Sequence, residues 1–346
     1  MKIIFRADGN STIGWGHVMR SLSIASAARD LGAECFFVCA DDSMRSLIER
    51  KDFRVDVLNT DYRDMESETD RFIEVIKKEK PDNIFVDSYY VSNDYFRTIK
   101  KYSKLIYLDD VFSFPYDVDY LINYNIYASY EAYSELYSEK TLPELLLGTE
   151  YIPLREEFIR NIPSGVRGEA KKVFVSTGGS DEFGLVLRII NKLKDDKELS
   201  EGIEYHFIIG SYEPDFDEIK SLSESNKWIH LHRNVKNMSE IMNICDVAIS
   251  AAGSTLYELC SCGVPTITYV IADNQIGGAT GFEEKKIMLN TGDLRKVDFD
   301  CSGIIDNLKL LLNDFELRKS LSEKMLSVVD GEGAERIIKK LCETGG

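Results

Sequence analysis

The chain has 346 residues, a length that suits two domains of about 150 residues each. Its 44% apolar and 29% charged residues are typical of a globular protein. The excess of 59 acidic over 42 basic residues gives a net charge of −17, which argues against non-specific nucleic-acid binding. An anionic ligand must therefore be held by local groups that act against the overall field.

The composition also bears on location and on cofactors. No apolar run approaches the roughly 18 residues of a membrane span, and MKIIFRADGN is typical of a buried strand rather than of a signal peptide. We therefore expect a cytoplasmic protein without membrane insertion. Seven scattered cysteines, with a lone Cys260–Cys262 pair, favour reduced thiols over a zinc site, so we expect no metal and no cofactor. The sequence does not predict an oligomer.

The first half of the chain alternates short apolar runs with helical patterns. The runs that we expect to be strands are residues 2–5, 35–39, 55–58, 83–86, 105–108 and 120–122. Residues 17–31 have apolar side chains at helical spacing and stop before Gly32. Continuous apolar strands separated by helices predict a parallel sheet covered on both faces.

A second series follows residues 160–172, a polar stretch with proline and glycine that is typical of an interdomain linker. Its predicted strands are residues 173–176, 205–209, 229–231, 247–250 and 266–270, and its predicted helices are residues 181–194, 214–225, 237–244 and 254–262. Residues beyond 290 read as further helices that complete this domain. We therefore predict an α/β protein with two Rossmann-like doubly wound domains, residues 1–160 and 161–346, facing each other across a cleft.

Ligands of open parallel sheets bind beyond the carboxyl ends of the strands. The segment RADGNSTIGWGHVMR, which includes Arg6 and Asp8, follows the first strand, and Gly14 and Gly16 can bring its backbone close to a ligand. His17 stands at a helix start, where the helix dipole disfavours a protonated imidazole. A neutral imidazole suits a general base, although a histidine here could also cap or pack. The segment lacks the glycine spacing of a dinucleotide-binding fingerprint.

The segment SAAGSTLYELCSCGVP follows another predicted strand. Gly253, Ser254 and Thr255 open a helix whose free N–H groups and hydroxyls can bind a diphosphate without a lysine. Glu258, one turn further, can accept hydrogen bonds from ribose hydroxyls. An ordinary N-cap followed by a first-turn glutamate would explain the same residues.

Two further segments follow strands of the second domain. VSTGGSDEFG brings Gly178, Gly179 and Ser180 to a helix start, which indicates either a second nucleotide-binding turn or a tight βα connection. ADNQ contributes Asn274 and Gln275, whose amides suit sugar hydroxyls and N-acyl groups.

Polar residues also follow two strands of the first domain. VDSYY places Asp87 and Tyr89 after one strand, and LDD places Asp109 and Asp110 after the next. Paired acids can bind metal, but DD after a strand is more often part of a turn or a cap.

An ordered set of motifs extends over most of residues 1–290: RADGNSTIGWGHVMRSLSIA, VDSYY, YLDD, LINYNIYA, LREEF, TGGSD, ISAAGSTLYEL and YVIADNQ. This set resembles the UDP-2,4-diacetamido-2,4,6-trideoxy-β-L-altropyranose hydrolase family of pseudaminic acid biosynthesis, which is similar in fold to the glycosyltransferase that forms lipid II. The resemblance implies a glycosyltransferase-B fold. It also implies hydrolysis of the UDP-linked sugar at its anomeric carbon, with inversion and without a metal, releasing UDP and the free sugar.

The resemblance further assigns roles to residues. It implies that His17 is the general base, that Tyr89 and Asn274 line the sugar and water site, and that residues 253–258 hold the uridine diphosphate. The partner is then a UDP-sugar. An alternative is a glycosyltransferase of the same fold that uses a UDP-sugar donor for surface or spore-coat polysaccharide. A non-catalytic nucleotide-sugar-binding protein is a third possibility, against which the presence of His17 argues.

Overall fold

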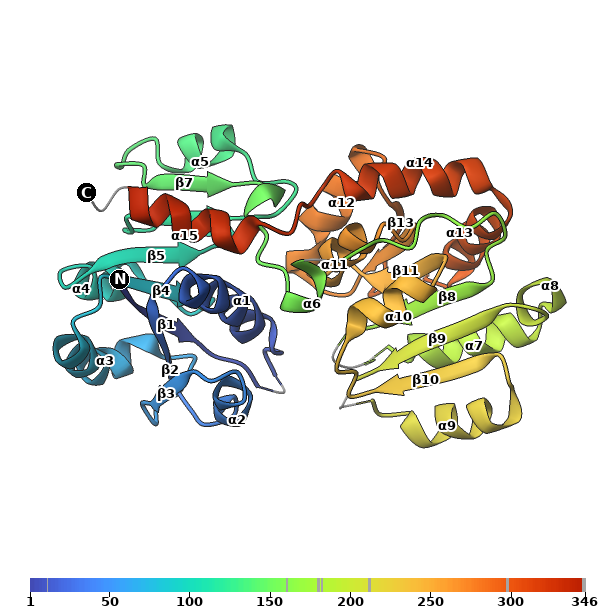
Figure 1. The fold of residues 1–346 in the computed structure, drawn as a ribbon, viewed down its shortest axis with the longest axis horizontal. Helices are drawn as coiled ribbons and strands as arrows, with labels where there is room; N and C mark the ends of the chain where they lie inside the picture. The colour runs from blue at the N-terminus through green and yellow to red at the C-terminus, as the bar shows by residue number, and fades with distance from the viewer. Residues whose placement is uncertain are drawn as a thin grey trace. The chain divides into compact units, whose positions relative to one another are not determined.

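The computed structural model describes residues 1–10, 12–159, 161–178, 181, 183–210, 213–296 and 299–343. The chain divides into two compact units (Figure 1), unit 1 with Met1–Arg155 and Gly331–Gly346, and unit 2 with Glu156–Asp330. The boundary lies five residues before the expected one, and the C-terminal segment belongs to unit 1 rather than to the second domain. The reason is an amphipathic helix, α15 (Gly333–Glu343), whose buried Ile337, Ile338 and Leu341 need an apolar partner surface. That surface lies in unit 1.

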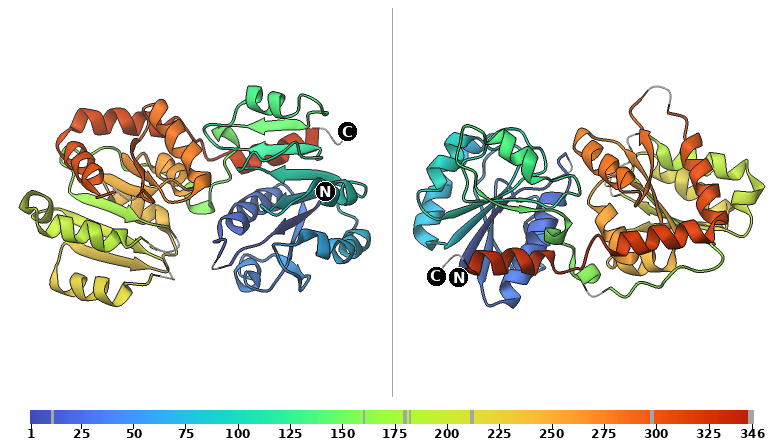
Figure 2. Two further views of the ribbon diagram at one scale, coloured as in Figure 1. Left: turned by 180° about the vertical axis from the view of Figure 1, so that it is seen from behind. Right: turned by 90° about the horizontal axis from the view of Figure 1, so that it is seen from above.

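Unit 1 is built on a parallel sheet of seven strands in the order β3-β2-β1-β4-β5-β6-β7 (Figures 1 and 2). The strands are β1 (Lys2–Ala7), β2 (Glu34–Cys39), β3 (Arg54–Val57), β4 (Asn83–Asp87), β5 (Lys104–Leu108), β6 (Tyr120–Asn123) and β7 (Glu144–Leu147). The helices before α15 are α1 (Gly16–Asp30), α2 (Arg45–Glu49), α3 (Met65–Glu79), α4 (Asn93–Ile99), α5 (Tyr130–Leu136) and the 3₁₀ helix η1 (Thr149–Tyr151). The expected strands are confirmed, and β7 is an additional one.

Helices cover both faces of this sheet, as the apolar strands predict. Helices α3, α4 and α5 pack on one face through a core that includes Phe72, Phe96 and Tyr133. On the other face Phe5 stacks against rings from the two neighbouring strands. Helix α1 packs against α15 and against β1 and β2, so the helix that begins with the predicted catalytic segment is supported by the C-terminus of the chain.

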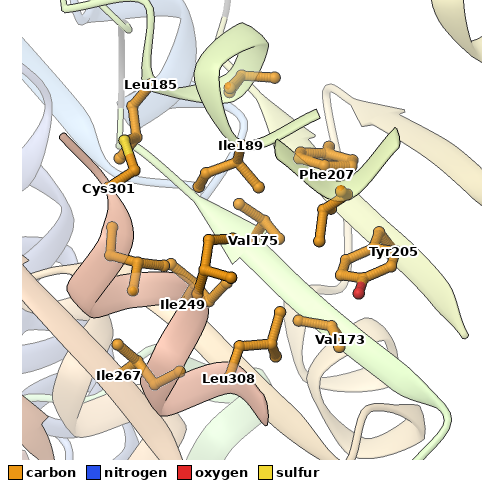
Figure 3. Close-up of a cluster of buried hydrophobic side chains, with 14 of the residues drawn as sticks. Val173, Val175, Leu185, Ile189, Tyr205, Phe207, Ile249, Ile267, Cys301 and Leu308 are labelled. Atoms are coloured by element: carbon orange, nitrogen blue, oxygen red, sulfur yellow. The ribbon is translucent and has the colours of Figure 1, made fainter. Parts of the chain in front are cut away.

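Unit 2 has a parallel sheet of six strands in the order β10-β9-β8-β11-β12-β13. The strands are β8 (Lys172–Ser176), β9 (Glu204–Ile209), β10 (Ile229–Arg233), β11 (Val247–Ala251), β12 (Thr266–Val270) and β13 (Leu289–Asp293). The helices are α6 (Glu156–Ile159), α7 (Leu185–Lys194), α8 (Lys197–Ser200), α9 (Phe216–Ser225), α10 (Met238–Ile244), α11 (Thr255–Cys262), η2 (Asp273–Gln275), α12 (Ile276–Glu284), α13 (Ser302–Asn313) and α14 (Phe315–Leu326). Figure 3 shows the core on one face, where Val175, Ile249 and Phe207 of the strands meet Ile189 of α7 and Leu308 of α13.

The strand order reverses once in each sheet, between β1 and β4 in unit 1 and between β8 and β11 in unit 2. Such a switch point opens a crevice at the carboxyl ends of the strands. Four of the predicted motifs follow these four strands, so each switch point is flanked by two of them. Within the described residues, no helix is long and apolar enough to cross a membrane.

Candidate functional site

In unit 1, His17 meets a carboxylate that sequence reasoning did not assign to it. His17 is the second residue of α1 and is only 5% exposed. Its Nδ1 lies 2.5 Å from Oδ1 of Asp87, the last residue of β4. Burial disfavours the ionised carboxyl, but the charges of Arg20 and His17 outweigh it and lower the pKa of Asp87 to about 2. Asp87 is therefore an anion at neutral pH, next to the imidazole.

Arg20, one helical turn after His17, joins this pair to the next strands. Its Nε and Nη2 donate to the two oxygens of Asp87 at 2.6 and 2.5 Å. Its Nη1 donates to Oδ2 of Asp110 at 2.8 Å and to the hydroxyl of Tyr124 at 2.7 Å. The i, i+3 spacing of His17 and Arg20 was the signal in the sequence for this network, whereas the pairing of β1 with β4 is seen only in the structure.

Tyr89 closes the network on its exposed side. Its ring lies edge-on to the imidazole of His17 with centroids 4.5 Å apart, and its hydroxyl donates to Oδ2 of Asp110 at 3.1 Å. Tyr89 is 38% exposed, so its ring is accessible beside the nearly buried histidine. The structure thus brings together two of the three predicted catalytic residues.

The loop before α1 is constrained by its glycines. Gly14 has a φ of +75°, in the left-handed region that favours glycine. The backbone N–H of Asn10 donates to the carbonyl of Gly14 at 3.1 Å. The side chain of Asn10 accepts from the N–H groups of Thr12 and Ile13. Gly16 is exposed as the first residue of α1. The backbone before His17 is therefore bent, glycine-rich and open to a ligand.

Arg6 and Asp8, which we expected to bind substrate, are buried structural residues in unit 1. Arg6 is fully buried, and its guanidinium donates twice to Glu68 at 2.6 Å and once to Asp8 at 2.5 Å. The other oxygen of Asp8 accepts from the N–H of Ala40 at 2.7 Å. A fully buried cation in an apolar sheet requires such pairing, which leaves little of either group for a ligand.

The two acids after β5 have separate roles. Asp109 accepts from the N–H groups of Val111 and Phe112 and from the hydroxyls of Tyr116 and Tyr133. Burial raises the pKa of Asp109, in spite of these donors. Asp109 is thus part of a turn, whereas Asp110 belongs to the network around Arg20.

In unit 2, α11 presents an uncapped N-terminus beyond β11. Ser254 precedes its first residue, Thr255, and no side chain caps the helix. In the described part of the chain, the backbone N–H groups of Ser254 and Thr255 have no hydrogen-bond acceptor. Glu258 lies in the first turn and is 9% exposed. Free N–H groups at the positive end of a helix form an anion site.

The second predicted nucleotide turn is different, because α7 already has a carboxylate at its N-terminus. Asp181 accepts from the N–H groups of Leu185 and Val186 at 2.9 and 2.7 Å. Gly178 is exposed, with a φ of +94°, and Gly179 and Ser180 lie outside the described residues. The first turn of α7 therefore offers less to a phosphate than that of α11.

Of the two residues predicted in the turn after β12, Gln275 lies near the N-terminus of α11. The amide nitrogen of Gln275 lies 4.0 Å from the position that a Cβ on Gly253 would occupy, and its Oε1 accepts from the N–H of Ile271. Asn274 is exposed in η2. Arg295 holds this turn by donating to Asp273 at 2.7 Å. Gln275 and Gly253 thus lie together, at the edge where a ligand is expected.

Sequence reasoning did not find the hollow beyond β10. It is open, with a volume of about 540 Å³, and it lies between the end of β10 and the start of α10. Its lining includes Arg233, Lys236 and Asn237. The strands from β10 to β11 are parallel, so the hollow lies at the same edge of the sheet as the α11 N-terminus. The described residues contain no group of three or more histidines, cysteines or acids that could hold a metal ion.

Comparisons with known proteins bear on both units. Residues 173–294 match the Glycosyltransferase family 28 C-terminal domain. A Campylobacter jejuni protein named UDP-2,4-diacetamido-2,4,6-trideoxy-beta-L-altropyranose hydrolase is 28% identical over 289 residues, 82% of this chain and 97% of that protein. A Helicobacter pylori protein, named pseudaminic acid cytidylyltransferase and the same hydrolase, is 31% identical over 170 residues, 49% of this chain. An uncharacterised Methanocaldococcus jannaschii protein is 27% identical over 290 residues, 80% of this chain.

The chain matches 56% of the length of the Methanocaldococcus protein and 27% of that of the Helicobacter protein. Among solved structures, Acinetobacter baumannii MurG has a TM-score of 0.68 at 13% identity, over 99% of both chains. A putative UDP-N-acetylglucosamine 2-epimerase from Listeria monocytogenes has a TM-score of 0.67 at 14% identity, over 99% of this chain and 96% of that chain. At such identities the likeness concerns the fold, and the prediction of a glycosyltransferase-B fold is confirmed. The chain is therefore similar in sequence to proteins named UDP-2,4-diacetamido-2,4,6-trideoxy-β-L-altropyranose hydrolase, and part of its second unit matches the Glycosyltransferase family 28 C-terminal domain.

Proposed function

We propose that the protein hydrolyses a UDP-linked 2,4-diacetamido-2,4,6-trideoxy sugar at its anomeric carbon, releasing UDP and the free sugar for pseudaminic acid biosynthesis. The observation that carries the proposal is the His17–Asp87 pair at 2.5 Å, beyond the switch point of unit 1. A buried carboxylate on one nitrogen of an imidazole orients the ring and prepares the other nitrogen to take a proton. The names of the relatives supply the substrate class.

The proposed chemistry is a single displacement. The Nδ1–H group of His17 donates to Asp87, and the lone pair of Nε2 is free to accept a proton. Nε2 removes a proton from water while the oxygen of that water attacks the anomeric carbon. The bond from that carbon to the diphosphate breaks, and UDP leaves with the electron pair. Attack opposite the leaving group inverts the anomeric centre. Tyr89, edge-on to His17, and Asn274 are proposed to line the sugar and water site.

Unit 2 is proposed to bind the UDP. The free N–H groups of Ser254 and Thr255 would stabilise the charge of the departing diphosphate without a metal. Glu258 would accept hydrogen bonds from the ribose, and the hollow beside Asn237 would take the base. The only cations proposed to be near the UDP are Arg233 and Lys236 of the hollow. The phosphates are thus held by local backbone N–H groups, as a chain of net charge −17 requires.

A glycosyltransferase with the same donor site is the second candidate, because the family 28 domain match covers 122 of the residues in unit 2. The two candidates differ in the nucleophile, which is water in one and a hydroxyl of an acceptor in the other. A non-catalytic binding protein would have no use for a buried His–Asp pair beside an exposed tyrosine.

The first test is UDP release from the UDP-linked sugar without any acceptor. We expect turnover by the wild-type protein, unchanged by EDTA, and a loss of at least about 10²-fold in His17→Ala with UDP affinity retained. His230→Ala, a half-exposed histidine in unit 2, is the matched control and should remain active. UDP release that depends on an added acceptor would favour the transferase. Near wild-type turnover by folded His17→Ala would disprove the role of the histidine.

A further inference from the structure

Two groups compete for Nδ1 of His17. Oδ1 of Asp87, which can only accept, lies at 2.5 Å, and Nη2 of Arg20, which can only donate, lies at 3.0 Å. If Nδ1 carries the proton it donates to Asp87, and Nε2 keeps its lone pair. If Arg20 donates to Nδ1 instead, the proton is on Nε2 and the ring cannot act as a base there. The tautomer therefore decides whether His17 can perform the proposed reaction.

The geometry favours the first tautomer, because Nδ1 and Oδ1 of Asp87 would repel each other at 2.5 Å if neither carried a proton. A guanidinium has five N–H groups. Arg20 directs four of them to both oxygens of Asp87, to Asp110 and to Tyr124, which leaves one N–H of Nη2 for Nδ1 of His17. Nη2 donates to Asp87 at 2.5 Å, which is 0.5 Å shorter than its distance to Nδ1. A bond to a carboxylate is the stronger kind, so donation from Nδ1–H to Asp87 is favoured over acceptance by Nδ1 from Arg20.

We propose that Arg20 is a positioning residue that sets both the tautomer and the basicity of His17 by fixing Asp87 and offsetting its charge. The proposal rests on the proposed function, because it assigns Arg20 a task in that reaction. Without Arg20, Asp87 would hold the proton on the imidazole after water has been deprotonated. With Arg20 at 3.0 Å, the imidazolium is less stable and returns the proton at the end of each cycle.

The charges that face His17 determine whether a substitution strengthens or weakens its hold on a proton. Asp87 comes from β4, Asp110 from the end of β5, and Arg20 from α1 itself. Tyr89 contacts the ring from the loop after β4, and Tyr124 reaches Arg20 from the end of β6. Burial raises the pKa of Tyr124 to about 12, so that hydroxyl stays neutral. Two carboxylates and one guanidinium remain as the charges that act on His17.

Two further groups lie on the outer side of the network. Asp109 precedes Asp110 but directs its carboxylate to Tyr116, Tyr133 and two backbone N–H groups. Tyr127 donates to the carbonyl of Asp110 at 3.2 Å, and burial raises the pKa of its hydroxyl above its usual range. Neither group contacts the imidazole, so Arg20 and Asp110 are the charges to vary.

Opposite substitutions should move activity in opposite directions. Arg20→Gln removes a positive charge, so His17 holds its proton more strongly and the acid limb of the pH profile of kcat moves up. A charge within about 4–6 Å shifts a titration by about one unit or more. Arg20→Gln should therefore lose about tenfold in kcat in the acid limb and recover at higher pH. Asp110→Asn removes a negative charge and should move the limb down, while Arg20→Lys keeps the charge and should leave the limb near that of the wild type.

Arg29→Gln is the matched control, because Arg29 lies on the same helix but packs over Phe53 and donates to the carbonyl of Lys51. Its profile should equal that of the wild type. UDP affinity should be unchanged in every variant, since unit 2 is not altered. A folded Arg20→Gln protein with an equal loss at every pH would overturn the proposal and leave Arg20 a structural role.

A measurement on the wild-type protein covers the case in which Arg20→Gln does not fold. The ¹⁵N chemical shifts of His17, assigned with His17→Gln, report which nitrogen carries the proton above the acid limb. We expect Nδ1–H, and an Nε2–H ring would overturn the proposal. The variants separate failure of this inference from failure of the proposed function. An inactive His17→Ala with an unshifted Arg20→Gln profile would reject only the present inference, whereas an active His17→Ala would reject the function itself.

Discussion

At the scale of single residues, two arginines of unit 1 show how position determines role. Arg6 lies within β1 and spends its donors on Glu68 and Asp8, which closes a network inside the unit. Arg20 lies on the first turns of α1 and holds Asp87 and Asp110 at the carboxyl edge. Both are cations paired with two carboxylates, but Arg6 is fully buried and Arg20 is only partly buried. Only Arg20 adjoins a side chain that can exchange a proton with a ligand.

A residue-scale prediction concerns Glu258 in the nucleotide site. Glu258→Ala should weaken UDP binding by at least about tenfold, because a hydrogen bond to a charged group contributes about 1.5–3 kcal/mol. Ser254→Ala should have a smaller effect, because the backbone N–H groups that we propose to bind the phosphate remain. Isothermal titration calorimetry with UDP measures both.

The control for this prediction is Glu316→Ala, an exposed first-turn glutamate on α14 of the same unit. It should bind UDP as the wild type does. Unchanged affinity in Glu258→Ala would remove this residue from the nucleotide site without touching the role of His17.

At the scale of elements, β9 and β10 place three of the four histidines of the chain side by side. His206 stacks between His230 and His232 with ring centroids 4.9 and 5.1 Å away, and its Nδ1 lies 2.9 Å from Nε2 of His232. Burial and the neighbouring histidines lower the pKa of His206 to about 4, and burial lowers that of His232. His206 and His232 are therefore neutral at pH 7, and adding a proton to His206 costs free energy.

The predicted consequence is a loss of stability on acidification. The unfolded chain binds a proton at His206 near pH 6.5, and the folded unit does so only near pH 4. Stability is thus fully present above pH 6.5 and declines as the pH falls through this range. Between pH 7 and pH 5, wild-type stability should fall by about 1–2 kcal/mol more than that of His206→Asn. Urea unfolding of both proteins at each pH measures the difference, and equal declines would contradict the assignment.

How far the sequence predicts these elements depends on where each signal lies. Apolar runs and helical spacing locate β1, α1, β8 and α11 to within a few residues, because burial imposes those patterns. β7 and β13 are edge strands that are only partly buried, and a short run such as Glu144–Leu147 carries little signal. The cap of α7 by Asp181 also depends on the local path of the backbone, which composition does not specify.

At the scale of the whole molecule, the site residues divide into those that follow from topology and those that follow from side-chain packing. His17 and the α11 turn are predictable because each follows a strand at a switch point. The pairing of His17 with Asp87 and the burial of Arg6 depend on which strands become neighbours and which face each side chain takes. The assignment of α15 to unit 1 likewise depends on which apolar surface remains uncovered, and a helical pattern in the sequence cannot report that.

The last prediction concerns this C-terminal helix. Gly333 begins α15 against η1, and a Cβ at this position would lie 2.3 Å from the carbonyl oxygen of Ile152 and 2.6 Å from its nitrogen. Because both atoms are backbone, Gly333→Ala must shift the helix that packs against α1. We expect a loss of about 1–3 kcal/mol in the free energy of unfolding and lower turnover, since α1 carries His17. Gly168→Ala, with no atom within 4 Å of its Cβ, is the matched control. Equal urea midpoints for the two variants would show that α15 does not support the first unit as the structure indicates.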